Sequence, residues 1–217
     1  MKPTRVQRLE EVAVAAAALA IALRLNHAAG LMADAAGEHA GLSPDLLLSV
    51  LPRVDTGPLF VYGFAVFLVW IIIVGLWTER RRAAYILWSY ALLTAARAFF
   101  IILTPMHRPA GGVSVDGDAL FRALGHSMTF EHDLFFSSHT AMPFLAFLIV
   151  RGRWIRLSFL FLSVLLAAAV LLGRFHYSID VFGAYFITFA VHKAEVRWFQ
   201  PAYNSWKRRW LQPANKL

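Results

Sequence analysis

Long apolar runs alternate with short polar loops along almost the whole chain. Crossing the hydrocarbon core of a bilayer takes about 20 mostly apolar residues in a helix. Six stretches approach that length, at residues 11–32, 58–77, 83–104, 134–150, 155–173 and 177–196. The pattern therefore predicts an all-α polytopic membrane protein, folded as a bundle of six transmembrane helices.

The loops between these stretches differ in charge. Lys and Arg gather before the first stretch, after the second, after the fourth and after the sixth, whereas the other three loops and their helix ends hold most of the Asp and Glu. By the positive-inside rule, both termini are cytoplasmic and loops 33–57, 105–133 and 174–176 face outward. Frequent alanine and arginine favour a bacterial inner membrane, which would make the outward side the periplasm.

We expect one helical membrane domain over residues 1–200, because no internal repeat or low-complexity linker interrupts it. Residues 201–217 combine aromatic and basic side chains, which is typical of membrane interfaces, and we interpret them as a cytoplasmic tail. The first stretch has a second interpretation, since a basic start, an Ala-rich core and Ala33-Asp34-Ala35 are also typical of a cleaved secretory signal. Cleavage would leave five helices in the same orientation.

The composition excludes several classes of protein. Hydrophobic residues make up 59% of the 217, and the mean hydropathy is +0.58, which argues against a water-soluble domain. The net charge of +8 follows from the membrane topology, and no basic stripe with interleaved aromatics predicts nucleic-acid binding. Since the chain has no cysteine, it has neither disulfides nor a thiol nucleophile.

Two histidines stand at the outward ends of predicted helices. His176 and Asp180 are four residues apart, hence on one face of a helix, and the carboxylate can fix the tautomer of the imidazole. The other ring nitrogen could then attack phosphorus or carry a proton. The plainer interpretation is an interfacial histidine beside a solvated aspartate.

His139 is the second of these histidines. It follows Ser137 and Ser138, which can cap the helix start and direct its N–H groups at an anion. The topology puts His139 on the same membrane face as His176, so one histidine could attack while the other protonates the leaving oxygen. The alternative for this segment is a simple helix cap.

Phosphoryl transfer also needs cations around the nonbridging oxygens. Arg97 lies inside a predicted membrane helix. Inserting an arginine there costs ~2.5–3.5 kcal/mol on insertion scales, so a functional role is expected. The alternative for Arg97 is an ion pair with Asp133. Arg108 and Arg174 are further candidates on the outward side.

A metal site is another chemical alternative, because oxygen and nitrogen donors crowd the third outward stretch at His126, Glu131, His132, Asp133 and His139. No pair among them has the i,i+4 spacing of a zinc-protease helix, so we predict no metal. The polar residues near the outer end of the first stretch are expected to hydrogen-bond between helices; they are Arg24, Asn26 and His27.

Four stretches resemble motifs of the sphingomyelin synthase-like branch of the type 2 phosphatidic acid phosphatase (PAP2) superfamily. They are Ser43-Pro44-Asp45, Arg97 with Thr104-Pro105, Asp133-Leu-Phe-Phe-Ser-Ser-His139-Thr140, and His176-Tyr-Ser-Ile-Asp180. The last two match in order, spacing and flanking residues. The resemblance implies a PAP2-like bundle of six helices, an active site on the non-cytoplasmic face, and no metal or organic cofactor.

The same resemblance assigns roles to the site residues. His176 would be the nucleophile that takes a phospho head group from a membrane phospholipid, Asp180 would orient it, and His139 would protonate the departing lipid oxygen. The groups expected to bind the substrate or its phosphate are Arg97, Arg108, Asp133, Ser138 and Arg174. A water acceptor makes the enzyme a phosphatase or phospholipase C-like hydrolase, and a lipid alcohol such as ceramide or diacylglycerol makes it a head-group transferase.

Departures from the superfamily pattern favour transfer. Ile101 and Val170 stand where typical lipid phosphatases have a lysine and an arginine, and Ser138 replaces the usual glycine of the third motif. We therefore expect a lipid head-group phosphotransferase. The second interpretation is a hydrolase and the third is a non-catalytic lipid transporter or scaffold. The sequence leaves the head group and the oligomeric state open.

Overall fold

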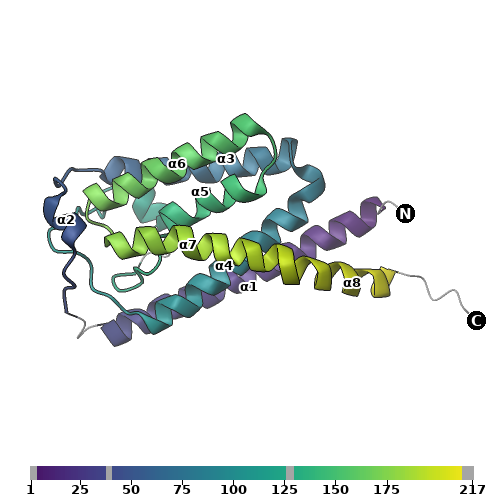
Figure 1. Cartoon of the computed structure of the whole chain (residues 1–217), viewed down its shortest axis with the longest axis horizontal. Coiled ribbons are helices and arrows are strands. Elements are labelled where there is room, and N and C mark those ends of the chain that lie inside the picture. The colour runs from purple at the N-terminus through teal and green to yellow at the C-terminus, as the bar shows by residue number, and fades with distance from the viewer. Residues whose placement is uncertain (1–3, 38–40, 126–129, 212–217) are drawn as a thin grey trace, which may run out of the picture.

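The computed structural model describes residues 4–37, 41–125 and 130–211. Within these ranges every regular element is helical and no strand occurs, which confirms the all-α class. The long helices run to and fro along one axis. Both chain ends lie at one end of the bundle, and the short helix α2 (Leu46–Val50) lies at the other (Figure 1).

The other elements follow in chain order. They are α1 (Arg5–Gly37), the π-helical turn η1 (Leu59–Gly63), α3 (Phe64–Trp77), the 3-10 turn η2 (Arg80–Arg82), α4 (Ala83–Leu103), the π-helical turn η3 (Phe121–Gly125), α5 (Ser138–Ile149), α6 (Arg153–Leu172), α7 (Ser178–Ala194), the π-helical turn η4 (Glu195–Phe199) and α8 (Gln200–Leu211).

Four helical stretches of the described chain are long and apolar enough to cross a membrane. They are Arg5–Gly37, Leu59–Trp77, Arg80–Leu103 and Arg153–Leu172, and they indicate an integral membrane protein. The two remaining predicted spans form shorter helices, since α5 has 12 residues and α7 has 17. Membrane crossing by these two helices stays a prediction.

The fourth predicted helix begins later than expected, at Ser138 rather than near residue 134. The backbone just before it bonds to other elements. The carbonyls of Asp133 and Phe136 accept hydrogen bonds from Arg97 at 2.7 and 3.0 Å, and the Ser137 N–H donates to the Asp180 carbonyl at 3.2 Å. These groups are therefore not used in helical bonds, and α5 starts inside the protein.

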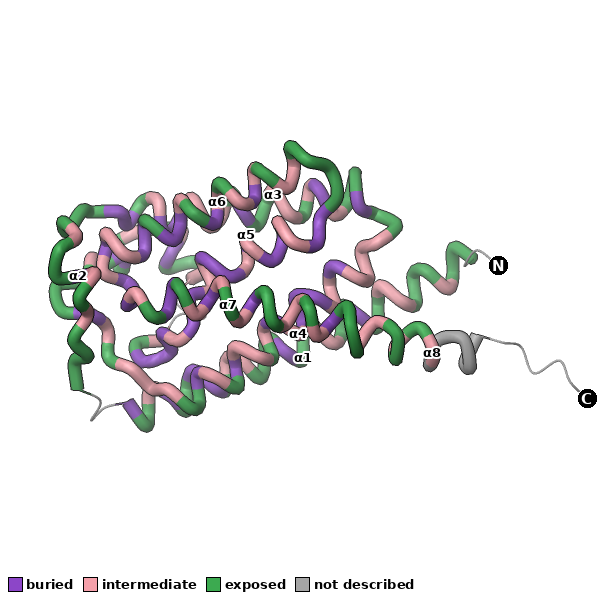
Figure 2. Tube along the Cα trace, viewed as in Figure 1, coloured by how far each residue is buried: buried purple, intermediate pink, exposed green. Residues whose placement is uncertain are grey.

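The helices form two groups. α1 and α4 lie side by side along most of their length (Figure 1). Their contact includes a cluster of buried, mostly small side chains, Ala29, Ala33, Ala98 and Ile101. α5 packs against α6 and α7, and the larger core there includes Phe67, Phe136, Leu145 and Phe159. No residue of α5 is fully exposed, so this short helix is the centre of the second group (Figure 2).

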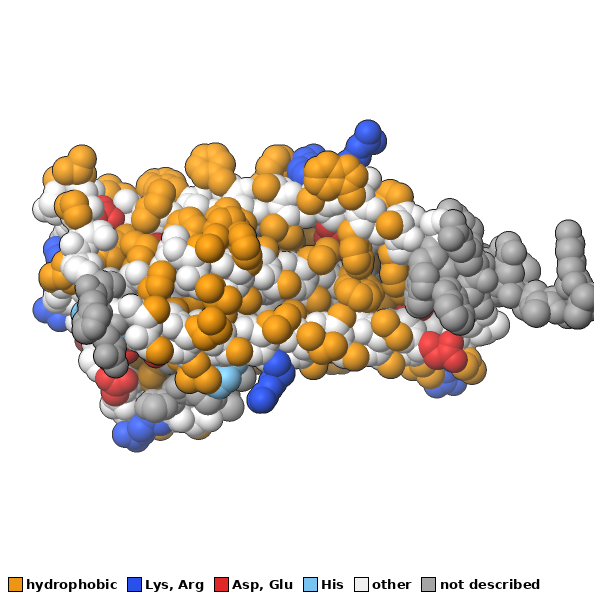
Figure 3. All heavy atoms as spheres, turned by 90° about the horizontal axis from the view of Figure 1, so that it is seen from below, with side chains coloured by type: hydrophobic (Ala, Val, Ile, Leu, Met, Phe, Trp, Pro, Cys, Tyr) orange, Lys and Arg blue, Asp and Glu red, His pale blue; other side chains and the backbone are white. Residues whose placement is uncertain are grey.

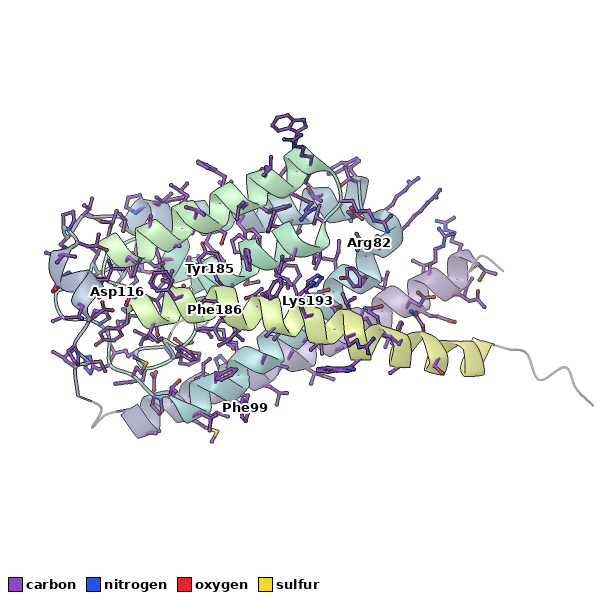
Figure 4. All side chains as sticks on the ribbon, viewed as in Figure 1. Arg82, Phe99, Asp116, Tyr185, Phe186 and Lys193 are labelled. Carbon is purple, nitrogen blue, oxygen red and sulfur yellow. The ribbon has the colours of Figure 1, made fainter. Side chains whose placement is uncertain are left out.

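The outer surface is largely apolar. Hydrophobic side chains cover most of the middle of the face in Figure 3. Phe99 of α4 and Phe186 of α7 point away from the bundle, whereas the charged Asp116 lies near the α2 end (Figure 4). Phe186 is 75% exposed. A chain with this surface is stable when lipid covers its middle.

The predicted tail begins as a helix. α7, η4 and α8 follow one another without a break, and the rings of Phe199 and Tyr203 lie 5.0 and 5.8 Å from Trp88 of α4. The described part of residues 201–217 thus continues the last helix of the bundle. The domain boundary after residue 200 and the interfacial role of the tail stay predictions.

Candidate active site

His176 and Asp180 form a buried pair at the start of α7. The helix begins at Ser178, so His176 precedes it, and the pairing comes from the helix cap rather than from a shared helical face as the spacing suggested. Asp180 Oδ2 accepts the Tyr177 N–H at 2.9 Å and lies 3.3 Å from His176 Nδ1. Asp180 is 0% exposed and His176 is 8% exposed. The carboxylate therefore holds the Nδ1 edge of the imidazole and leaves Nε2 for a ligand.

His139 lies in the first turn of α5 against a wall of aromatic rings. Its ring stacks on Phe60 at 3.9 Å between centroids and lies 4.3 Å from Phe64. Phe60 also stacks on Phe175 at 4.1 Å, directly before His176 in the chain. Phe60 belongs to the π-helical turn η1, a kind of turn that is frequent at functional sites. This wall joins the two histidine-bearing segments.

The structure brings these segments together at the α2 end of the bundle. The hydrogen bond from Ser137 to Asp180 ties the start of α5 to the first turn of α7. The Phe60 ring stacks on His139 and on Phe175, the residue before His176, so one ring contacts both segments. The two predicted histidines therefore share one site.

Several buried oxygens at this site lack a hydrogen bond within the described part of the chain. They are Ser137 Oγ, Thr140 Oγ1 and Asp180 Oδ1. Ser137 is the N-cap of α5, yet its side chain makes no cap bond. A buried polar group without a partner costs about 1–3 kcal/mol. The two hydroxyls and the first N–H groups of α5 can thus donate to an anionic ligand, whereas Asp180 Oδ1 can only accept a hydrogen bond.

Arg97 forms the ion pair with Asp133 that was the alternative to phosphate binding. Both terminal nitrogens lie 3.3 Å from Asp133 Oδ2, and one of them also donates to Asn26 Oδ1 of α1 at 3.2 Å. With the carbonyls of Asp133 and Phe136 included, every nitrogen of the guanidinium has a protein acceptor. Phosphate binding by Arg97 would require these bonds to break.

Arg174 borders a cavity near the start of α7. Its φ of 55° is unusual for a residue other than glycine, and its guanidinium donates to the carbonyls of Ala110 and Leu48 at 3.3 Å each. The cavity has a volume of about 410 Å³, and its walls include Asp45, Leu48, Pro109, Arg174 and Tyr177. Neither histidine lines the cavity, but Arg174 and Tyr177 flank His176 in the chain.

Two further predicted binding residues, Arg108 and Ser138, are partly exposed. The Arg108 side chain has no hydrogen bond or ion pair within the described residues, and the Ser138 hydroxyl has none there either. No partner among the described residues therefore competes with a ligand for either group.

The two positions at which the chain departs from typical lipid phosphatases are both apolar and fully buried. Ile101 is 0% exposed and packs against Ala29 and Ala33 of α1. Val170 is also 0% exposed, and its carbonyl accepts the N–H groups of Phe175 and His176 at 2.9 and 3.3 Å. A cation at either position would be inside apolar packing.

The alternative of a metal site receives no support from the described residues, among which no group of three His, Asp or Glu side chains is placed to hold an ion. His132 pairs instead with Asp34 of α1, which accepts its N–H at 2.8 Å and lies 3.2 Å from its Nδ1. His126 lies outside the described residues.

The sequence did not single out every residue that shapes the site. Phe60 is one of 18 phenylalanines, and no local signal marks it. Asn26 was expected only to bond between helices, although an amide inside an apolar helix is a signal for a buried polar partner. Asp34 was noted only for its loop charge and as part of the possible cleavage sequence Ala33-Asp34-Ala35, and neither feature predicted its pairing with His132.

The fold and these groups define a class: an all-helical membrane protein with a carboxylate-paired histidine at one end of its bundle. Residues 132–196, which include α5, α6, α7 and both histidines, match the family described as PAP2 superfamily C-terminal. The match supports membership of the PAP2 superfamily, whose members are typically phosphatases or phosphotransferases. No curated protein and no solved structure matches the chain.

Proposed function

We propose that the protein transfers phospho head groups between lipids through a phosphohistidine on His176. The observation that carries this proposal is the buried pair in which Asp180 Oδ2 faces His176 Nδ1 at 3.3 Å. A carboxylate in this place fixes the tautomer and stabilises the charge that the imidazole gains as it reacts. The free Nε2 is then the nucleophile.

The reaction has two half-reactions. In the first, His176 Nε2 attacks the phosphorus of a donor phospholipid, the P–O bond to the lipid breaks, and His139 gives a proton to the departing oxygen. In the second, His139 takes a proton from an acceptor hydroxyl as its oxygen attacks phosphorus and the P–N bond breaks. Each histidine thus returns to its starting state. This scheme calls on no metal and no organic cofactor.

The remaining site residues have supporting roles. The first turn of α5, which includes Ser138, directs its N–H groups and the positive end of the helix dipole toward the phosphate oxygens. Arg108 and Arg174 supply positive charge on the cavity side. The Arg97–Asp133 pair holds the backbone that leads into α5, and so fixes the position of His139.

Transfer to a lipid alcohol fits the site better than hydrolysis. Phe60 and Phe64 cover the His139 ring, and an apolar cover disfavours water as the acceptor that His139 must deprotonate. The apolar packing of Ile101 and Val170 removes the two cations that typical lipid phosphatases use. We therefore assign the chain to the sphingomyelin synthase-like branch, with ceramide or diacylglycerol as acceptor.

The site faces the outward leaflet in this proposal. It lies at the α2 end of the bundle, opposite the two chain ends (Figure 1). The segments next to those ends are rich in Lys and Arg. Positive charge marks the cytoplasmic side of membrane proteins. In a bacterial inner membrane the reaction would then take place at the periplasmic surface.

The test uses purified full-length protein in detergent with phospholipids labelled in the head-group phosphate. Phosphatidylcholine, phosphatidylethanolamine, phosphatidylglycerol and phosphatidate are each incubated with and without ceramide or diacylglycerol. We expect a new labelled phospholipid that forms only with the acceptor. Release of phosphate or phosphoalcohol at the same rate without acceptor would replace the transferase with a hydrolase. No turnover of any donor, in the presence or absence of acceptor, would overturn the enzyme assignment.

A further inference from the structure

Asp45 joins the starts of two helices that are far apart in the sequence. Its Oδ1 accepts the N–H groups of Leu47 and Leu48 in α2 at 2.9 and 3.0 Å. Its Oδ2 accepts the N–H of Ser178, the first residue of α7, at 2.6 Å. Three backbone donors thus converge on one carboxylate, and the bond to Ser178 is short and charge-assisted.

A second hydrogen bond runs parallel to this one. The Ser43 N–H donates to the Tyr177 hydroxyl at 3.2 Å. The Tyr177 side chain is buried and packs against Leu48 and Leu134. The segment around Asp45 is therefore attached to two successive residues, 177 and 178, that directly follow His176.

These attachments control the geometry of the histidine pair. The Tyr177 N–H bonds to the same Asp180 oxygen that faces His176, so the backbone at 177–178 sets the position of Asp180 relative to the imidazole. If the start of α7 shifts, then His176 Nδ1 and its carboxylate shift relative to one another. Among the described residues Asp45 makes no hydrogen bond or ion pair with the imidazole or with Asp180, and it bonds to the α7 backbone at Ser178.

We propose that Asp45 is a positioning residue, which holds the start of α7 so that His176 is aligned for attack on phosphorus. The inference rests on the proposed function, because it concerns the nucleophile of that reaction. Asp45, Tyr177 and Arg174 also line the 410 Å³ cavity, so this attachment forms part of the wall beside the site. A head group in the cavity would lie against the residues that align His176.

Asp45 must be a carboxylate to accept hydrogen bonds from all three backbone N–H groups, those of Leu47, Leu48 and Ser178. Burial alone would raise the pKa of the Asp45 carboxyl, but the hydrogen bonds from Leu48, Ser178 and Leu47 hold it below its ordinary value. The group is thus ionised throughout ordinary assay conditions and loses these bonds only as the pH falls through that lowered pKa. Asparagine has one acceptor oxygen, and its amide would direct N–H donors at a backbone donor.

The experiment measures phosphohistidine formation in a single turnover, with labelled phospholipid in excess and no acceptor, in Asp45→Asn and the wild type. The amplitude counts correctly folded sites, and the rate constant reports alignment of the nucleophile. We expect an unchanged amplitude with a rate constant about 10- to 100-fold lower, since small displacements of reacting groups have effects of this size. A merely structural role would lower the amplitude and leave the rate constant intact.

Two variants complete the design. Asp55→Asn is the matched control, because Asp55 is an exposed loop carboxylate whose one hydrogen bond among the described residues is from the nearby Gly57 N–H at 3.1 Å, a bond that asparagine can also make. Its rate constant should equal that of the wild type. Tyr177→Phe removes the parallel bond from Ser43 and should lower the rate constant in the same direction by a smaller factor, and it serves as the test if Asp45→Asn does not fold.

The outcomes separate the two proposals. A wild-type protein that forms no phosphohistidine overturns the proposed function, whatever Asp45 does. If the wild type forms phosphohistidine and Asp45→Asn does so with the same rate constant, the positioning role is overturned and the proposed function stands. Where Tyr177→Phe is the test, its rate constant is compared with that of the wild type in the same way.

Discussion

The α1–α4 pair and the α5–α6–α7 group bury polar groups in different ways. In the first, Arg97 is bonded through all three nitrogens, and Asn26 of α1 is one of its acceptors. In the second, the buried oxygens of Ser137, Thr140 and Asp180 have no hydrogen-bond partner within the described residues. Partners that saturate a charge give rigidity, whereas open acceptors and donors give a place for a ligand.

This difference distinguishes a supporting region of the molecule from the region that contains the candidate active site. The family match covers residues 132–196, which contain both histidines. It includes neither α1 nor α4, because both helices precede residue 132. The α1–α4 pair meets that region through fixed contacts, among them the bonds from Arg97 to Asp133 and from His132 to Asp34. We infer that the α5–α6–α7 group carries the reaction and that the α1–α4 pair holds it in place. Loss of α1 by cleavage would remove Asn26 and Asp34 from this support.

The largest expected effect is that of His176→Ala. Removing the nucleophile should lower lipid turnover by ~10⁴-fold or more, with an unfolding temperature in detergent close to that of the wild type. His107→Ala, which changes an exposed histidine between α4 and α5, is the control and should retain activity. Full turnover by His176→Ala would mean that the α5–α6–α7 group reacts through another residue.

Asp180→Asn should have the next largest effect. The amide keeps the shape of the side chain but can no longer stabilise an imidazolium, so we expect kcat to fall by ~10²–10⁴-fold with residual activity. Steady-state kinetics on the same labelled donor measures the loss, and Asp116→Asn, at an exposed loop carboxylate, is the control. An unchanged kcat would show that Asp180 only caps α7.

Arg97→Met tests the supporting region. It leaves the Asp133 carboxylate buried without its cation, which should destabilise the protein by about 3–5 kcal/mol. Thermal unfolding in detergent measures the change, and the double variant Arg97→Met/Asp133→Leu should recover much of it. Arg108→Met, at an arginine with no partner among the described residues, should stay within about 0.5 kcal/mol of the wild type. Equal stability of all these variants would contradict a fixed supporting pair.

Gly30→Ala is expected to have the smallest effect. A Cβ at Gly30 of α1 would collide with the ring of Phe130, which must then move away from its contact with His27. We expect a loss of about 1 kcal/mol, seen as a lower unfolding temperature. Gly75→Ala in α3, where a Cβ meets open space, should instead gain about 0.5–1 kcal/mol. If both changes stabilise, α1 does not pack closely on the segment at Phe130.

Local patterns were sufficient to predict much of the fold. Apolar runs placed the helices, because burial in lipid requires an uninterrupted apolar surface and satisfied backbone groups. They failed at residues 134–137, where Leu134 and the two phenylalanines continue the apolar pattern but the backbone bonds to Arg97 and Asp180 instead. The spacing of His176 and Asp180 predicted their contact, although the contact arises at a helix cap.

The sequence by itself determined the apolar helices, the sidedness of the charges and the two histidine segments, because hydropathy, net loop charge and short spacings are local properties of the chain. Only the tertiary structure decided that Arg97 is saturated by Asn26 and Asp133, that Phe60 covers His139, and that Asp45 holds the start of α7. These contacts join residues from distant parts of the chain. Their partners are selected by how whole helices pack, which no local pattern records.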